Sequence, residues 1–326
     1  MIRWGIIGCG DVTEVKSGPA FQKATGSALV AVMRRNGALA ADYAQRHGVP
    51  KHYDDGARLI ADPEVDAVYV ATPPDAHKEY TLMAAAAGKP VYVEKPMARN
   101  HAECLAMIEA CDAADVPLWV AYYRRALPRF LKVKELLDGG AIGAVRTVTA
   151  RLYQPAKPEQ FAGEQLAWRL DPKVAGGGIF VDLASHTLDY LDYFLGPITQ
   201  IRGFAGNQAG NYAAEDTVAT SFVFASGVQG NGIWSFNNFE NVDETEIAGE
   251  RGKLTFASFE EAPVRLTTAD GVREFHIPNP AHVHQPLVQS IVDELNGQGK
   301  CASTGVSGAR ANRLMDQILQ PYYASR

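Results

Sequence analysis

The feature with the clearest chemical meaning is an acid and an imidazole, Asp182 and His186, that stand four residues apart in the sequence. In a helix, residues with this spacing lie on one face, so both side chains would project into the same space. A histidine can act as general base on a substrate hydroxyl, and the acid can bind a second hydroxyl or tune the imidazole. The spacing predicts a catalytic pair; the alternative is a core histidine satisfied by a hydrogen bond.

A lysine adds a third catalytic candidate. Lys95 lies in the run Glu94–Pro96, directly after a short apolar strand pattern, and the run Thr72–His77 follows another such pattern. In a parallel sheet, ligands bind beyond the carboxyl ends of the strands. A lysine there can stabilise a developing alkoxide or polarise a carbonyl in the reverse direction. On the residues alone, a surface lysine in a loop is an equal alternative.

A glycine-rich turn, Gly8–Thr13, follows the first strand pattern and precedes a helical one. Its glycines would let the backbone approach a pyrophosphate at a helix N-terminus. Thr13 replaces the third glycine of the usual fingerprint, and Gly18-Pro19 would break or kink the following helix. The turn predicts a dinucleotide site, with a tight turn that holds no ligand as the alternative.

The second strand pattern ends at Arg34 and Arg35, about where an NAD-binding protein would carry an acid for the ribose hydroxyls. Guanidinium groups suit a 2′-phosphate because they form planar, charge-assisted bonds to phosphate oxygens. The arginines therefore favour NADP, with NAD possible. The alternative is a pair of exposed arginines that tolerate either cofactor.

The elements that must position these residues fall into two groups. Residues 1–122 alternate short apolar runs with helical patterns, which predicts a doubly wound parallel sheet with right-handed crossovers. Residues 123–326 contain a helix around Asp182 and His186, then successive strands from Thr199 to His276, and two closing helices. The fold class is α/β, with a second α/β domain built on a large open, mostly antiparallel sheet. One face of so large a sheet must be covered, either by helices or by another subunit, so the sheet is a candidate for oligomerisation.

Composition narrows the classes of function. The chain of 326 residues is long enough for two cores, and its net charge of −6 argues against a nucleic-acid or polybasic membrane surface. No apolar run approaches the roughly 20 residues of a membrane span, and the N-terminus leads directly into a strand pattern, so we expect a cytoplasmic protein. The four cysteines are scattered, and His282-Val-His284 has no acid or cysteine cluster beside it. We assign no metal and expect a small-molecule substrate.

Read together, the glycine turn, Thr72-Pro73 with His77, Glu94-Lys95-Pro96, the run from Gly176 to Asp189, and Glu246–Leu254 resemble the Gfo/Idh/MocA oxidoreductase family. The resemblance implies an N-terminal Rossmann domain and a C-terminal sheet that often joins subunits, hence a homodimer or homotetramer. It also implies that Lys95, Asp182 and His186 match the family's catalytic positions. Trp168-Arg169 looks like a pair found in NADP-using sugar reductases of the family.

The sequence thus predicts an NADP(H)-dependent oxidoreductase that interconverts a secondary hydroxyl and a carbonyl on a sugar, polyol or dihydrodiol. Two alternatives stay open: a non-catalytic dinucleotide-binding sensor or regulator, and a glycosidase that uses bound NAD for redox-assisted cleavage. Substrate contacts are expected from Lys95, Trp168, Arg169, Asp182 and His186. Cofactor contacts are expected from Gly8, Gly10, Asp11, Val12, Thr13, Arg34, Arg35, Thr72, Pro73, His77, Glu94 and Lys95.

Overall fold

The computed structural model describes residues 1–161 and 167–324, which form two compact units. The first unit contains Met1–Leu127 and Pro280–Ala309, and the second contains Pro128–Asn279 and Arg310–Arg326. The sequence placed a single boundary after Tyr122, between ranges 1–122 and 123–326. It did not anticipate that a segment near the C-terminus returns to the first unit.

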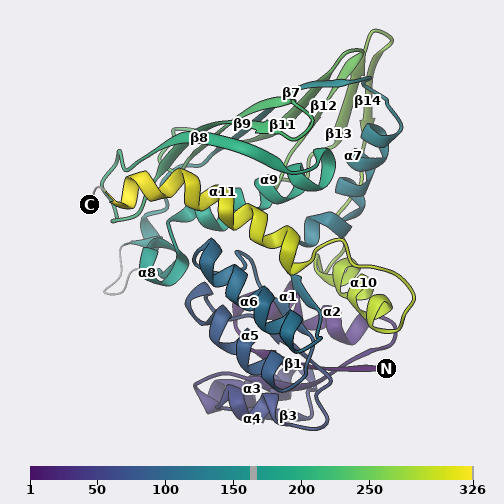
Figure 1. Ribbon diagram of the computed structural model, residues 1–326, viewed down its shortest axis with the longest axis vertical. Coiled ribbons are helices and arrows are strands. Elements are labelled where there is room, and N and C mark those ends of the chain that lie inside the picture. The colour runs from purple at the N-terminus through teal and green to yellow at the C-terminus, as the bar shows by residue number, and fades with distance from the viewer. Residues whose placement is uncertain (162–166, 325–326) are drawn as a thin grey trace. The chain divides into compact units, whose positions relative to one another are not determined.

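The first unit is built on a six-stranded sheet with the order β3-β2-β1-β4-β5-β6 (Figure 1). Every pair of neighbouring strands is parallel, which confirms the predicted doubly wound sheet. Its strands are β1 (Ile2–Ile7), β2 (Ser27–Met33), β3 (Lys51–Tyr53), β4 (Ala67–Val70), β5 (Val91–Val93) and β6 (Leu118–Val120). The sequence missed only β3, a short edge strand with no buried residue.

The first crossover is split as Gly18-Pro19 predicted. A Cβ on Gly18 would lie 2.2 Å from the carbonyl oxygen of Thr13, so only glycine fits where the chain turns between the two short helices. The helices of this unit are α1 (Asp11–Val15), α2 (Gly18–Lys23), α3 (Gly37–His47), α4 (Gly56–Ile60), η1 (Pro74–Ala76), α5 (His77–Ala86), α6 (His101–Ala113), η2 (Tyr123–Ala126) and α10 (Gln285–Leu295).

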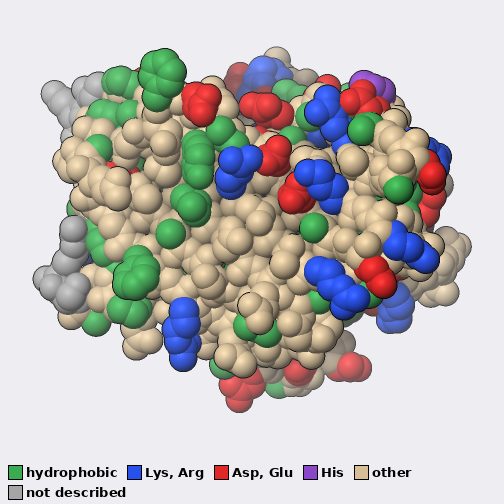
Figure 2. Space-filling view, turned by 90° about the horizontal axis from the view of Figure 1, so that it is seen from above, with side chains coloured by type: hydrophobic (Ala, Val, Ile, Leu, Met, Phe, Trp, Pro, Cys, Tyr) green, Lys and Arg blue, Asp and Glu red, His purple; other side chains and the backbone are tan. Residues whose placement is uncertain are grey.

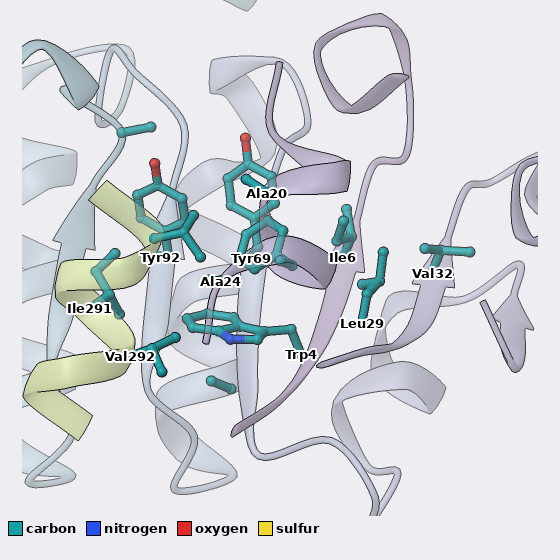
Figure 3. Close-up of a cluster of buried hydrophobic side chains, with 14 of the residues drawn as sticks. Trp4, Ile6, Ala20, Ala24, Leu29, Val32, Tyr69, Tyr92, Ile291 and Val292 are labelled. Carbon is teal, nitrogen blue, oxygen red and sulfur yellow. The ribbon is translucent and has the colours of Figure 1, made fainter. Parts of the chain in front are cut away.

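An aromatic cluster fills one face of this sheet (Figure 3). The ring of Trp4 packs 5.0 Å from that of Phe21, and Tyr69 stacks on Tyr92 at 4.8 Å. Helix α10 lies against these rings through Ile291 and Val292, both buried. The returning segment is thus part of the hydrophobic core of the first unit, and its burial stabilises that unit.

The second unit contains an eight-stranded sheet with the order β14-β13-β12-β11-β7-β10-β9-β8. Only β7 and β10 run parallel, so the sheet is mostly antiparallel, as predicted. Its strands are β7 (Val145–Tyr153), β8 (Ile198–Gly206), β9 (Thr217–Phe224), β10 (Gln229–Ser235), β11 (Val242–Gly249), β12 (Gly252–Phe256), β13 (Val264–Thr268) and β14 (Gly271–Phe275).

Helices of the second unit gather on one side of its sheet (Figure 1). The aromatic rings of Phe130, Tyr190, Phe194 and Phe256 pack together there. The helices are α7 (Pro128–Asp138), η3 (Pro158–Gln160), η4 (Trp168–Leu170), α8 (Pro172–Ala175), α9 (Ile179–Leu195) and most of α11 (Gly305–Ala324).

The opposite face of this sheet is exposed, and charged side chains pair across it. Lys253 contacts Glu246 at 2.6 Å and Arg265 contacts Glu274 at 2.7 Å. A view from above shows basic and acidic side chains gathered at one end and hydrophobic side chains more frequent at the other (Figure 2). This face therefore has a polar part and an apolar part.

Candidate active site

The glycine turn connects β1 to α1, and Gly8 is required there by the fold. Its φ is +92°, a conformation that side chains rarely adopt, and a Cβ would lie 2.8 Å from the backbone nitrogen of Thr72. The amides of Gly8 and Cys9 both donate to the carbonyl oxygen of Met33, at 2.9 and 3.1 Å. The turn is therefore fixed against β2 and the loop after β4.

Gly10 differs from Gly8 because nothing in the fold requires it. Its backbone is extended, and the only atom within 4 Å of a Cβ built there is the carbonyl oxygen of Gly8, at 3.8 Å, among the described residues. The missing side chain leaves open space at the start of α1, beside exposed Asp11 and half-buried Val12. Such a cradle fits the close approach of a pyrophosphate to the backbone.

Thr13, the replacement for the third glycine, closes the turn from inside. Its side chain is fully buried, and its hydroxyl donates to the carbonyl oxygen of Gly10 at 2.7 Å. The hydroxyl of Tyr43 in turn donates to the carbonyl oxygen of Thr13 at 2.8 Å. Burial raises the pKa of the Cys9 thiol to about 11, so this thiol stays protonated at neutral pH.

Arg34 and Arg35 follow β2 with exposed side chains. The positive charge of Arg34 partly opposes the rise in the pKa of the Cys9 thiol that burial causes. Arg35 has the same effect on the pKa of Tyr80. Within residues 1–161 and 167–324, neither guanidinium takes part in an ion pair. Asn36 caps helix α3 by accepting from two backbone amides, which fixes where the arginines leave the strand.

His77 joins the loops at the ends of β4 and β5. It is fully buried, with Nε2 2.8 Å from the carbonyl oxygen of Thr72 and Nδ1 3.1 and 3.2 Å from those of Pro96 and Met97. Burial lowers its pKa. The ring is thus engaged with the backbone on both sides, and it holds the Thr72-Pro73 loop against the lysine loop.

Lys95 is half-buried at the end of β5, and the Lys95–Pro96 bond is cis. Its backbone N–H donates to Glu94 Oε2 at 3.1 Å. Glu94 is buried, and its other oxygen accepts from the hydroxyl of Tyr69 at 2.5 Å. The backbone of Lys95 is therefore hydrogen-bonded to a carboxylate that is itself hydrogen-bonded to Tyr69 on β4.

In the second unit, α9 begins where Glu215 meets the glycine run. Glu215 Oε1 accepts from the backbone N–H of Gly178 at 2.8 Å, and Oε2 accepts from the hydroxyl of Tyr323 at 2.5 Å. A Cβ on Gly178 would lie 2.6 Å from the carbonyl oxygen of Glu215. These close contacts give Gly178 a packing role. The sequence did not single out Glu215.

Asp182 and His186 lie on α9, so the predicted helix and the shared face are confirmed. The His186 side chain is buried and meets Phe259 edge-on at 5.9 Å. Arg169 donates through Nε to Asp182 Oδ2 at 3.1 Å, and its guanidinium lies 4.3 Å from the centre of the Trp168 ring. The second unit thus brings Trp168, Arg169 and Asp182 into contact between η4 and α9, and His186 follows on α9 four residues after Asp182.

Lys95 belongs to the first unit, and the loop before Trp168 falls partly on residues 162–166, outside the described residues. Two buried groups that sequence reasoning missed, Glu215 and Tyr69, are neighbours of the predicted residues. Their roles depend on contacts between segments far apart in the chain, for which the sequence carries no local signal.

Comparison with known proteins assigns both halves of the chain. Residues 2–122 match a model described as an oxidoreductase family with an NAD-binding Rossmann fold, and residues 130–255 match the GFO/IDH/MocA C-terminal domain. The chain belongs to the Gfo/Idh/MocA family of oxidoreductases. The resemblance and the enzyme class predicted from the sequence are both confirmed.

Relatives in this family match the chain over nearly its full length. It is 39% identical to oxidoreductase P35 of Formosa agariphila over 315 residues, which cover 97% of both chains. It is 29% identical to the 1,5-anhydro-D-fructose reductase of Ensifer adhaerens, covering 94% of this chain and 92% of that one. Among solved structures, the aldose-aldose oxidoreductase of Caulobacter crescentus in complex with glycerol superposes with a TM-score of 0.87 at 25% identity, covering 100% and 98%.

The protein is therefore an oxidoreductase with an NAD-binding Rossmann domain. Within the described ranges, none of the helices has both the length and the apolar character that a membrane crossing requires.

Proposed function

We propose that this protein is an NADP(H)-dependent oxidoreductase that interconverts a secondary hydroxyl and a carbonyl on a sugar, polyol or dihydrodiol. The observation that carries the proposal is the shared face of α9, which presents Asp182 and His186 with Arg169 beside Asp182. An acid, an imidazole and a guanidinium supply several hydrogen bonds to a polyhydroxylated substrate. The sugar-directed names of two relatives support the same substrate class.

In this proposal His186 takes the proton of the reacting hydroxyl, and Lys95 stabilises the oxygen as negative charge develops. Asp182, already bonded to Arg169, binds a second hydroxyl, and Trp168 offers an apolar platform for the sugar ring. The bound nicotinamide supplies the hydride acceptor or donor.

The preference for NADP is proposed from Arg34 and Arg35. Both are exposed and make no ion pair with a described residue, so their donors are available to a phosphate group. We expect Arg34→Ala with Arg35→Ala to weaken NADPH binding by at least about 10-fold, since each hydrogen bond to a charged group contributes about 1.5–3 kcal/mol. NADH should lose far less, measured by fluorescence titration of the reduced nicotinamide. Equal losses for both cofactors would remove the phosphate role.

The test of the reaction is a panel of aldoses, polyols and dihydrodiols, each followed at the absorbance of the reduced nicotinamide with NADP and with NAD. One substrate class should reduce NADP. Lys95→Ala and His186→Ala should each lower turnover by a factor of at least about 10², the lower range for a general acid or base, with cofactor affinity nearly intact. Wild-type turnover in either variant contradicts the proposed roles.

Silence across the panel, with tight cofactor binding, would favour the sensor or regulator. Cleavage of glycosides without net change of the nicotinamide would favour the redox-assisted glycosidase. Retention of the cofactor through purification, without release when substrate is added, would also favour the glycosidase, whereas a sensor has no need of Lys95 and His186.

We also propose that the chain forms a homodimer or homotetramer through the exposed face of the eight-stranded sheet. On this sheet Phe204 and Val272 are 86% and 61% exposed, and Ile233 is 37% exposed. Burial of such side chains is a common driving force for subunit association. Sedimentation of the wild type and of Phe204→Glu tests this: the wild type should be oligomeric and the variant should dissociate. A monomeric wild type would refute the proposal.

A further inference from the structure

His284 is a buried histidine, the second of the His282-Val-His284 sequence for which no metal was assigned. His284 immediately precedes α10, in the segment that returns to the first unit. Its side chain is 1% exposed, and its ring lies 4.5 Å from that of Tyr123. An imidazole buried this deeply needs partners for both ring nitrogens.

Two groups face the ring nitrogens, one on β5 and one directly after this strand, next to Lys95. The Tyr92 hydroxyl lies 3.0 Å from Nδ1 of His284, and Glu94 Oε1 lies 3.7 Å from Nε2. Figure 3 shows the hydroxyls of Tyr69 and Tyr92 emerging from the aromatic cluster on the same side. Tyr69 donates to the same oxygen of Glu94, whose second oxygen accepts from the backbone N–H of Lys95.

The charge and the tautomer of the ring follow from its surroundings. Burial, with the positive charges of Lys16, Lys95 and Arg124 nearby, lowers the pKa of His284 to about 3, so the ring is neutral at neutral pH. Burial raises the pKa of Tyr92 well above its usual value, so its hydroxyl keeps its proton. Because Nε2 of His284 faces the Glu94 carboxylate at 3.7 Å, a proton on Nε2 is the favourable tautomer, and the Tyr92 hydroxyl then donates to Nδ1. The ring proton then resides on Nε2 and faces the Glu94 carboxylate. The contact is a neutral N–H directed at a carboxylate rather than an ion pair.

We infer that His284 is a positioning residue for Lys95, acting through Glu94. The hydroxyl of Tyr69 donates to one carboxylate oxygen, the Nε2–H of His284 faces the same oxygen at 3.7 Å and attracts it electrostatically, and the other oxygen accepts from the backbone N–H of Lys95. A buried carboxylate held by several donors has one orientation, so the backbone of the lysine that follows it is held in one position. The position of this backbone determines where the Lys95 side chain begins. This inference rests on the proposed function, in which the Lys95 ammonium acts on the substrate oxygen.

The test removes the Nε2–H while keeping an aromatic ring. In Tyr92→Phe/His284→Phe neither residue leaves an unpaired hydroxyl or nitrogen. We expect kcat to fall by about 10- to 100-fold, the range for a misplacement of up to about 1 Å in a catalytic group. KM for the substrate and Kd for NADPH should stay within about twofold, because neither ligand is proposed to contact His284. Tyr92→Phe alone and His282→Gln, in the same segment, serve as matched controls and should keep most of kcat.

Rescue distinguishes positioning from packing. His284→Gln carries an N–H donor at a similar distance along the side chain, so it should recover part of the kcat lost in the phenylalanine variant. A kcat within twofold of wild type in the double variant, or equal loss in the glutamine and phenylalanine variants, would overturn the inference. If Lys95→Ala keeps wild-type turnover, the proposed function fails first. If Lys95→Ala is inactive while the double variant is fully active, only the role of His284 fails.

Discussion

The two glycines of the turn should respond in opposite ways to the same methyl group. In Gly10→Ala, the added Cβ meets only the carbonyl oxygen of Gly8 at 3.8 Å, an ordinary contact, and the backbone is already extended. Alanine at such a position lowers the entropy of the unfolded chain, so the free energy of unfolding should stay equal or rise by about 0.4–1 kcal/mol. If the turn cradles a pyrophosphate, the same methyl group occupies the space of the ligand.

Cofactor affinity should therefore fall while stability does not. A methyl group forced into a well-packed contact costs about 1–3 kcal/mol, which corresponds to about a 5- to 150-fold rise in the Kd for NADPH. Urea unfolding without cofactor measures the stability, and fluorescence titration measures the Kd. Wild-type affinity in Gly10→Ala would refute the assignment of this turn to the cofactor.

Gly8→Ala is the matched control. Here the Cβ would lie 2.8 to 2.9 Å from backbone atoms of Thr72 and Ala71, and φ is +92°. The positive φ costs about 1–2 kcal/mol and the crowding about 1–3 kcal/mol, so the variant should lose about 2–5 kcal/mol of stability. If only Gly8→Ala loses NADPH binding, the loss reflects its lower stability. Loss of NADPH binding in the stable Gly10→Ala variant indicates that the cofactor occupies the space of the added methyl group.

Three further results are expected in the second unit. Burial raises the pKa of Glu215 above 4.5, so its contribution to stability is complete below about pH 4.5 and is lost as pH rises through the folded pKa. In Glu215→Gln, the free energy of unfolding from urea curves should fall less with rising pH than in the wild type. The same pH dependence in both proteins would contradict this. Gly178→Ala should destabilise by about 1–3 kcal/mol because its Cβ meets backbone at 2.6 Å, whereas Gly206→Ala, with nothing within 4 Å among described atoms, should not. Arg169→Met removes the bond to Asp182 and should raise KM for the substrate with little change in cofactor Kd; an unchanged KM would separate Arg169 from the substrate site.

Local patterns predicted most of the secondary structure because period and composition act over a few residues. Successive strands were predicted from Thr199 to His276, where β8 to β14 lie, and the Gly18-Pro19 break is present. The short strand β3 was missed because its residues are polar or half-exposed and show no period. Glu215 and His284 could not be assigned, since their partners lie 37 and 192 residues away in the chain and only the folded chain brings them together.

The return of Pro280–Ala309 to the first unit bears on how cofactor preference can be exchanged between members of this family. The dinucleotide-binding unit is encoded in two separate stretches, and Ile291 and Val292 of the second stretch belong to the same buried cluster as Trp4 and Tyr92 of the first. A chimaera that replaces only residues 1–127 would pack another protein's core residues against Ile291 and Val292. An exchange of the whole cofactor-binding unit between family members should therefore include both Met1–Leu127 and Pro280–Ala309, because the two stretches share one hydrophobic core.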